Sequence, residues 1–406
     1  MPCRLDSPAS VGPAPATPLP EPLAWIDREL EELAAADLMR PRRTRLGRQG
    51  REVALDGRVL LNFGSNDYLG YSGDARLVKA LAKGACAEGA GAGASPLVSG
   101  HSAAHEALER SLATLLDVEA ALAFPSGFAA NTATIAALVG PGDLVASDDR
   151  NHASIIDGCR LSRATVAVYP HRDVAALDTM LAGAAARRKL VVTDTLFSMD
   201  GTVAPLADLA AVAARHGAML MVDEAHATGV FGARGSGLVE ELACADGVHV
   251  RVGTLSKALG AAGGFVAGHA ALVEFLRHAA RAWIFSTAHP PAVAAAATRA
   301  LGLLADEPER RRDLRCRAEA FRAALARGGI DTGAAAAQIV PVVAGAPAAA
   351  VAVAAALADE GFFAPAIRPP SVPEGSSLVR ASVCWHHSER DLERLTEALL
   401  RHAPRH

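Results

Sequence analysis

The run Val248-His249-Val250-Arg251-Val252, followed by Thr254-Leu255-Ser256-Lys257-Ala258-Leu259-Gly260, is the stretch from which the fold of this chain can be worked out. The first run is short and β-rich, which predicts a strand. The second holds one lysine among small residues and leads into a glycine-rich turn, so we expect Lys257 on irregular backbone just past the strand. A partly desolvated lysine has a lowered pKa and presents a neutral amine, which can act as a nucleophile or a base. Most lysines are solvated surface charges, so this segment is a weak indication when taken alone.

The other predicted strands are also short, apolar without strict alternation, and separated by helical stretches. Such strands are buried on both faces, and their alternation with helices predicts an α/β fold. We expect one mostly parallel, seven-stranded sheet with helices on both faces. Its strands are predicted at residues 120–125, 143–147, 165–169, 189–195, 218–223, 248–253 and 263–268. Ligands bind beyond the carboxyl ends of strands in such sheets, so we expect the functional residues there.

The 406 residues are too many for one small core, and we expect a large domain and a smaller one. Residues 1–22 are rich in Pro and Ala and predict a disordered tail. Residues 23–60, with a helix at Leu23 to Met39 and a hairpin at Asp56-Gly57, are expected to join the small domain. The large domain is predicted at residues 61–290, and the small α+β domain at residues 291–406.

Composition excludes several kinds of partner. The net charge is -4 and no long basic run is present, which argues against nucleic acid as a partner. The charge-free stretch from Thr332 to Ala358 is interrupted by prolines, so it predicts a strand, a loop and an Ala-rich helix rather than a membrane span. The six cysteines are scattered with no Cys-x-x-Cys pair, which is typical of reduced thiols in a cytoplasmic protein and indicates no metal site.

Three polar features follow the predicted strands. Ser126-Gly127-Phe128 joins a strand to a helix, where free backbone N–H groups can hold a phosphate, although many ordinary turns contain Ser-Gly. His152 follows the strand at 143–147; a histidine there is more often a helix cap or a core residue, but an imidazole can also stack on a planar ring. Ser198 lies in a turn that places a hydroxyl group at a strand's carboxyl end.

A fourth feature is the run Val222-Asp223-Glu224-Ala225-His226, which continues a predicted strand. Asp223 lies where the buried segment ends, and a carboxylate there needs a cationic partner to offset its desolvation. A pyridinium nitrogen would be such a partner. The fifth feature is Thr254 with Lys257, in which the hydroxyl can donate to a phosphate oxygen and the amine can form a Schiff base with an aldehyde.

In this order the features resemble those of the α-oxoamine synthases, which are fold-type I pyridoxal-phosphate enzymes. The resemblance covers about residues 23–400. Asp223-x-x-His226 and Thr254-x-x-Lys257 mark the superfamily. The runs Asn66-Asp67-Tyr68-Leu69-Gly70 and Ile367-Arg368-Pro369-Pro370-Ser371-Val372-Pro373 are more specific to the family.

The resemblance implies a role for each matching residue. Lys257 would hold pyridoxal 5'-phosphate as a Schiff base and later move the substrate's α-proton. The residues implied to act with it in catalysis are His152, Asp223 and His226. Those implied to bind the cofactor are Gly127, Phe128, His152, Ser198, Asp223, His226, Thr254, Lys257 and, from a second subunit, Thr287. Those implied to bind the substrate are Arg40, Asn66, His152, Ser371 and Arg380, whose planar guanidinium suits an amino acid's carboxylate.

The implied reaction is an acyl transfer in biotin synthesis. L-alanine would condense with a pimeloyl thioester, on coenzyme A or a carrier protein, with loss of CO₂, in a homodimer. Other family members use glycine or serine or another acyl thioester, and these alternatives stay open. A nucleotide-binding domain without catalysis would leave the combination of Asp223, His226 and Lys257 unexplained.

Overall fold

The computed structural model describes residues 19–404 of the chain. Most of the predicted tail, residues 1–18, therefore lies outside the described residues. Contacts divide the chain after Arg42 into an N-terminal unit and a main body. The N-terminal unit holds a short 3₁₀-helix, Glu21–Leu23, and α1, Trp25–Ala35, which confirms a helix within the predicted range.

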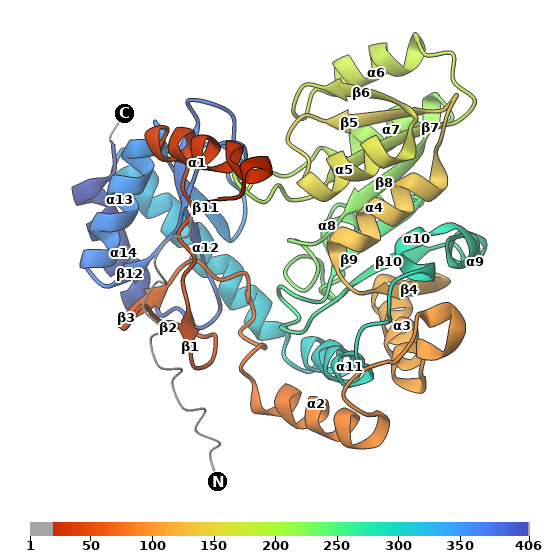
Figure 1. The fold of residues 1–406 in the computed structure, drawn as a ribbon, viewed down its shortest axis with the longest axis horizontal. Coiled ribbons are helices and arrows are strands. Elements are labelled where there is room, and N and C mark those ends of the chain that lie inside the picture. Colours follow the sequence, from red (N-terminus) through yellow and green to blue (C-terminus); the bar gives the residue numbers. More distant parts are fainter. Residues whose placement is uncertain (1–18, 405–406) are drawn as a thin grey trace. The chain divides into compact units, whose positions relative to one another are not determined.

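The main body is built around the predicted seven-stranded sheet (Figure 1). β7, β8 and β9 form its centre, and β5 and β6 follow β7 toward one edge; all five are parallel. At the other edge β10 is antiparallel to both β9 and β4, so the expectation of a mostly parallel sheet is confirmed. In spatial order the strands are β4 (Ala120–Phe124), β10 (Gly264–Gly268), β9 (Val250–Thr254), β8 (Met219–Asp223), β7 (Lys189–Asp194), β5 (Leu144–Asp148) and β6 (Thr165–Tyr169).

Helices cover both faces of this sheet, which explains why its strands lack polar alternation (Figure 1). In β7, Leu190 and Val192 pack into one core, and Val191 between them packs into the other. The first core lies under α4 (Gly127–Leu138), α5 (Ala153–Ser162), α9 (Ala270–Ala279) and α10 (Arg281–Ile284). The second lies under α3 (Ala103–Leu116), α6 (Val174–Ala182), α7 (Leu206–Arg215) and α11 (Pro291–Asp306), and α11 also packs on α2 (Ala75–Glu88).

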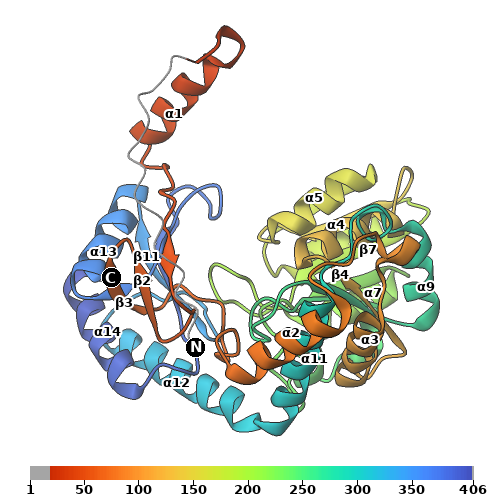
Figure 2. The same ribbon diagram turned by 60° about the horizontal axis from the view of Figure 1, so that its bottom comes forward.

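Two smaller sheets lie in the main body, and one of them combines strands from both of its ends (Figure 2). The predicted hairpin at Asp56-Gly57 is present, and its second strand pairs in parallel with β12 from the C-terminal part. One sheet contains β1 (Arg45–Leu46), β2 (Glu52–Leu55), β3 (Arg58–Asn62) and β12 (Phe362–Phe363), and the other contains β11 (Ile339–Gly345), β14 (Ser377–Ser382) and β13 (Ala366–Ile367). The helices of this region are α12 (Pro308–Arg327), α13 (Pro347–Asp359) and α14 (Glu389–His402). The division at residues 290 and 291 remains a prediction.

An ion pair joins the N-terminal hairpin to the last helix. Arg51 donates from Nε and Nη2 to the two carboxylate oxygens of Asp391, over 2.7 and 2.6 Å. Asp391 also accepts the backbone N–H and the hydroxyl hydrogen of Ser388, which caps α14. Burial alone would raise the pKa of Asp391, but these hydrogen bonds outweigh burial and lower its pKa to about 2.

Asp391→Asn should therefore lower the free energy of unfolding at pH 7 by about 2 kcal/mol, because it removes the charge-assisted pair. The folded-state pKa lies below the unfolded value of about 4, so this stabilisation is present above pH 4 and is lost as the pH falls toward 2. Urea unfolding at several pH values measures the difference. The exposed Glu393 on the same helix supplies the control, Glu393→Gln, which should change stability by less than about 0.5 kcal/mol. Equal stability of the two variants at pH 7 would contradict this assignment.

Candidate active site

Lys257 lies in the loop that follows β9, where the sequence predicts it. Its Nζ is 2.7 Å from Nε2 of His226, which lies in the turn after β8. Burial lowers the pKa of Lys257 to about 8, although the nearby carboxylates of Asp223 and Asp194 act in the opposite direction. Burial, together with the charge of Lys257, also holds the pKa of His226 well below its usual value. The site therefore combines an amine that is easily neutralised with a neutral imidazole.

Two carboxylates end the adjacent strands β7 and β8. Asp194 and Asp223 are direct neighbours in the sheet. Asp223 accepts hydrogen bonds from Nδ2 of Asn131, over 2.6 Å, and from the N–H of Ala225, over 2.8 Å. Asp194 is buried beside Asp223, and burial and this like charge both raise its pKa well above the usual value. Asp223 accepts two hydrogen bonds from neutral protein groups, and it is the carboxylate that the sequence predicts to face a cation.

His152 is both a helix cap and a neighbour of these charges. Its Nδ1 accepts the N–H of Ser154 at the start of α5, as a capping residue does. Its backbone N–H donates to Asp194 over 2.8 Å. Burial lowers the pKa of His152, and the charges of Asp223 and Lys257 are close enough to affect that pKa as well. The capping role that we weighed for His152 is thus present, and it leaves the imidazole next to the carboxylates.

The start of α4 packs closely against the two strands that flank Lys257. A Cβ atom at Gly264 would lie 2.4 Å from the backbone nitrogen of Gly127, so only glycine fits there. A Cβ atom at Gly127 would lie 3.3 Å from Cβ of Thr254. Ser126 accepts the N–H of Ala129 and caps the helix, which leaves the first N–H groups, those of residues 127 and 128, for a ligand.

The side chains of Thr254 and Phe128 are less available to a phosphate than the backbone is. The hydroxyl of Thr254 donates to the carbonyl of Gly263 over 2.9 Å and lies 2.8 Å from the hydroxyl oxygen of Ser256. Its hydrogen is therefore already used, and Ser256, which the sequence did not single out, is the more exposed hydroxyl group of the two. Phe128 is 47% exposed, so its side chain faces outward while its backbone starts the helix.

The predicted substrate clamp lies on the small sheet. Arg380 on β14 is buried, and its Nη2 donates to Oδ1 of Asn66 over 3.0 Å. The same Nη2 donates to the hydroxyl oxygen of Tyr68 over 3.3 Å. Among the described residues, Nε of Arg380 has no hydrogen-bond partner although it is buried. A buried donor without a partner is costly, and a carboxylate oxygen would satisfy it.

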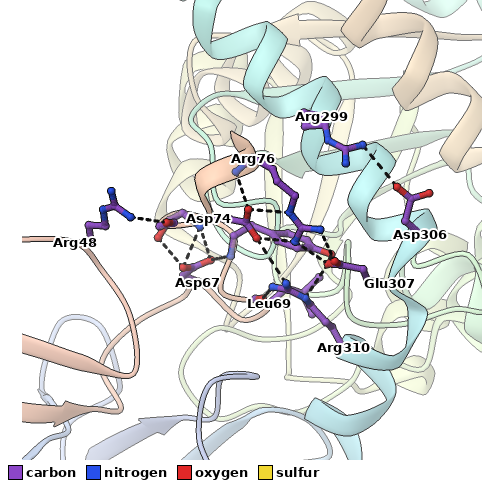
Figure 3. Close-up of polar contacts among 12 residues, drawn as sticks. Arg48, Asp67, Leu69, Asp74, Arg76, Arg299, Asp306, Glu307 and Arg310 are labelled. Atoms are coloured by element: carbon purple, nitrogen blue, oxygen red, sulfur yellow. Dashed lines mark hydrogen bonds and ion pairs between the residues drawn. The ribbon is translucent and has the colours of Figure 1, made fainter. Parts of the chain in front are cut away.

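A polar network fixes the loop that carries Asn66 and Tyr68 (Figure 3). Arg310 on α12 donates to the carbonyl of Leu69 over 2.9 Å and pairs with Glu307. Asp67 accepts the N–H groups of Tyr71 and Ser72, which closes the turn after the loop. The loop is thus held by α12 and by its own turn, which keeps Asn66 and Tyr68 in position for the site.

The remaining predicted residues lie on other segments of the chain. Ser371 lines a cleft of about 720 Å³ whose apolar walls include Phe197 and Pro370. Ser198 lies in the turn after Phe197, and Thr287 is exposed after α10. Arg40 belongs to the N-terminal unit, so its contact with substrate remains a prediction.

Three residues of the site were missed or given no role from the sequence. Tyr68 stands within a quoted run, and its hydroxyl oxygen is 2.7 Å from Nδ1 of His226. Asn131 also donates to the hydroxyl oxygen of Ser154, over 2.9 Å, besides its bond to Asp223. Asp194 closes its strand in the same register as Asp223. The position of Asp194 at a strand's carboxyl end was a usable signal, whereas the contacts of Tyr68 depend on the tertiary fold.

Comparison with known proteins identifies the family. The family described as aminotransferase class I and II matches residues 58–399. Proteins named 8-amino-7-oxononanoate synthase from Anaeromyxobacter sp. (strain Fw109-5) and Azoarcus sp. (strain BH72) are 52% and 46% identical over 93% of this chain, and over 95% and 98% of their own lengths. The chain belongs to the class I and II aminotransferase family and, within it, to the 8-amino-7-oxononanoate synthases.

Solved structures agree with this assignment. A serine palmitoyltransferase from S. paucimobilis with bound PLP and myriocin has a TM-score of 0.89 at 30% identity, covering 94% of this chain and 97% of that one. An 8-amino-7-oxononanoate synthase from Francisella tularensis has a TM-score of 0.74 at 25% identity, covering 84% and 97%. The expectation of a fold-type I transferase is therefore confirmed.

Asn131→Ala should lower the free energy of unfolding by about 1–3 kcal/mol, because it removes a donor from the buried carboxylate of Asp223. Chemical denaturation at pH 7 measures this loss. Thr134 lies on the same helix, is fully buried, and its hydroxyl has no hydrogen-bond partner among the described residues, so Thr134→Val is the matched control. The control should retain wild-type stability. An Asn131→Ala variant as stable as the control would show that this hydrogen bond does not support Asp223.

Proposed function

We propose that this protein is a pyridoxal-phosphate-dependent acyltransferase that condenses L-alanine with a pimeloyl thioester, with loss of CO₂, to form 8-amino-7-oxononanoate in biotin synthesis. The observation that carries the proposal is the contact of Lys257 with His226 at 2.7 Å, one strand away from the carboxylate of Asp223. The identity of 46% and 52% to proteins named for this activity supports the choice of reaction.

The residues of the site fit the cofactor. The N–H groups at the start of α4, brought against Thr254 by glycines, suit its phosphate. Asp223 suits the ring nitrogen, because its carboxylate is buried and its protein donors are neutral groups. Lys257, with its pKa lowered to about 8, suits the aldehyde. When bound, pyridoxal phosphate supplies an electron sink that stabilises negative charge on the substrate's α-carbon.

The chain's own residues then supply binding and proton movement. Arg380 binds the carboxylate of the amino acid through its free Nε, with Asn66 beside it. The amine of Lys257 takes the α-proton, since a lowered pKa leaves a useful fraction neutral near pH 8. The cleft beside Ser371, with its largely apolar walls, is the place we assign to the acyl chain.

The proposal includes a homodimer. Four apolar side chains that lie on adjoining elements are 47–78% exposed. Phe128 lies on α4, and Phe285 directly follows α10. Leu97 and Val98 lie in the π-helical turn Pro96–Gly100, and both this turn and α4 pack on α10. A surface of this kind marks an interaction site, and Thr287 next to it would then reach the partner's phosphate site.

A cytoplasmic location is part of the same proposal. The five cysteines of the described range are all unpaired, which supports a reducing compartment. Within residues 19–404, none of the helices has both the length and the apolar content that a membrane crossing requires.

Serine is the second candidate for the amino acid. Serine palmitoyltransferases have TM-scores of 0.88–0.89 with this chain, above the 0.74 of the Francisella tularensis synthase. Sequence identity points the other way, because relatives at 46% and 52% identity are named 8-amino-7-oxononanoate synthase. A direct assay separates the two candidates.

Incubating the holoenzyme with pimeloyl-CoA and L-alanine should release coenzyme A at least about tenfold faster than with glycine or serine, a difference that one methyl or hydroxyl group can produce. Thiol release and mass spectrometry of the product measure the outcome, and palmitoyl-CoA is the matched acyl control. Faster release with serine and palmitoyl-CoA would replace the proposed reaction by that of the second candidate. Lys257→Ala should be inactive with every pair of substrates.

A further inference from the structure

A chain of hydrogen-bonding groups connects the substrate clamp to the amine of Lys257. It runs from Nη2 of Arg380 to the hydroxyl of Tyr68, then to the imidazole of His226, and then to Nζ of Lys257. The three distances are 3.3, 2.7 and 2.7 Å. Tyr68 is fully buried and joins two halves of the site that lie on different sheets.

The direction of the hydrogens in this chain follows from its first member. A guanidinium group only donates, so the oxygen of Tyr68 accepts from Arg380. The single hydroxyl hydrogen of Tyr68 can then go to His226 or to Oδ1 of Asn66, which is 3.2 Å away. Oδ1 of Asn66 already accepts from Arg380, and Nδ1 of His226 is closer, so the hydrogen goes to His226.

This direction decides the tautomer of His226. A neutral imidazole carries one hydrogen, and with Nδ1 accepting, that hydrogen resides on Nε2. It points at Nζ of Lys257, which can accept it only as a neutral amine. If His226 had the opposite tautomer, Nε2 would accept a hydrogen bond from the ammonium form and stabilise it. The backbone of His226 is held separately, since Nε2 of Gln338 donates to its carbonyl oxygen over 2.9 Å.

We propose that Tyr68 is a positioning residue that holds His226 in the Nε2–H tautomer and thereby favours the neutral amine of Lys257. The purpose of the arrangement rests on the proposed function, in which that amine is the nucleophile. The arrangement itself rests only on the four side chains and on the loop that Arg310 and Asp67 hold in place.

Several charged groups face the same amine. Asp223 on β8 and Asp194 on β7 favour its charged form, and Arg380 on β14 disfavours it. The charge of His152, at the start of α5, lowers the pKa of His226. Of these groups, Arg380 also contacts the hydroxyl of Tyr68, and in Tyr68→Phe its Nη2 keeps Oδ1 of Asn66 as an acceptor. The substitution therefore acts on Lys257 mainly through the tautomer of His226.

The tautomer can be observed in the full-length protein freed of cofactor, labelled with ¹⁵N at histidine. The resonances of His226 are assigned by their loss in His226→Asn. The wild type should show Nε2 protonated and Nδ1 unprotonated, and Tyr68→Phe should show the other tautomer or a mixture. A wild-type protein with its hydrogen on Nδ1 would overturn the inference, and this measurement needs no folded Tyr68 variant.

The consequence for Lys257 is a change in its reaction with added pyridoxal phosphate. The pH midpoint of the loading rate, followed by visible absorbance, should lie near 8 in the wild type and about one pH unit higher in Tyr68→Phe, because the ammonium form gains an acceptor. Tyr169→Phe is the matched control, since Tyr169 is also fully buried and its hydroxyl has no partner among the described residues. The control should keep the wild-type midpoint.

The outcomes separate this inference from the proposed function. A folded Tyr68→Phe protein that loads pyridoxal phosphate with the wild-type pH midpoint and still catalyses the condensation would overturn the role of Tyr68. The proposed function would stand. A wild-type protein that does not take up pyridoxal phosphate would overturn the proposed function, while the ¹⁵N measurement would still decide the tautomer.

Discussion

The desolvation of one amine is the constraint on which the site depends. Lys257 has lost most of its contact with water, so its charged form is disfavoured even with two carboxylates nearby. Its partner His226 cannot take the proton, because burial holds the pKa of that imidazole well below its usual value. The protein therefore keeps a reactive amine next to a neutral ring and places the negative charge one strand away, on Asp223.

Glycines make this arrangement possible because the elements approach more closely than side chains would allow. A Cβ atom at Gly253 would lie 2.2 Å from the ring of Phe265, and one at Gly264 would meet the backbone of Gly127. The strands that flank Lys257 and the start of α4 thus meet with almost no space between them. The site's second half comes from the small sheet and from the loop at Asn66. Arg310 on α12 holds this loop by donating to the carbonyl of Leu69, and Glu307 pairs with Arg310 (Figure 3).

Much of this could be predicted from the sequence, for identifiable reasons. The seven strands were found because strands buried on both faces form short apolar runs between helices, and their ends located Asp223 and Lys257. Tyr68 and Asn131 were not assigned roles, because each acts through a partner far away in the chain, His226 and Asp223. The capping of α5 by His152 was weighed beforehand, but only the structure could show that capping leaves its ring beside the carboxylates.

The central claim is that Lys257 is the amine that carries the cofactor. The direct measurement is reduction of the yellow holoenzyme with borohydride, followed by proteolysis and mass spectrometry of the peptides. The account predicts a pyridoxyl-phosphate adduct on the peptide that contains Lys257, with full loss of the visible band. An adduct on any other lysine, or none, would contradict it.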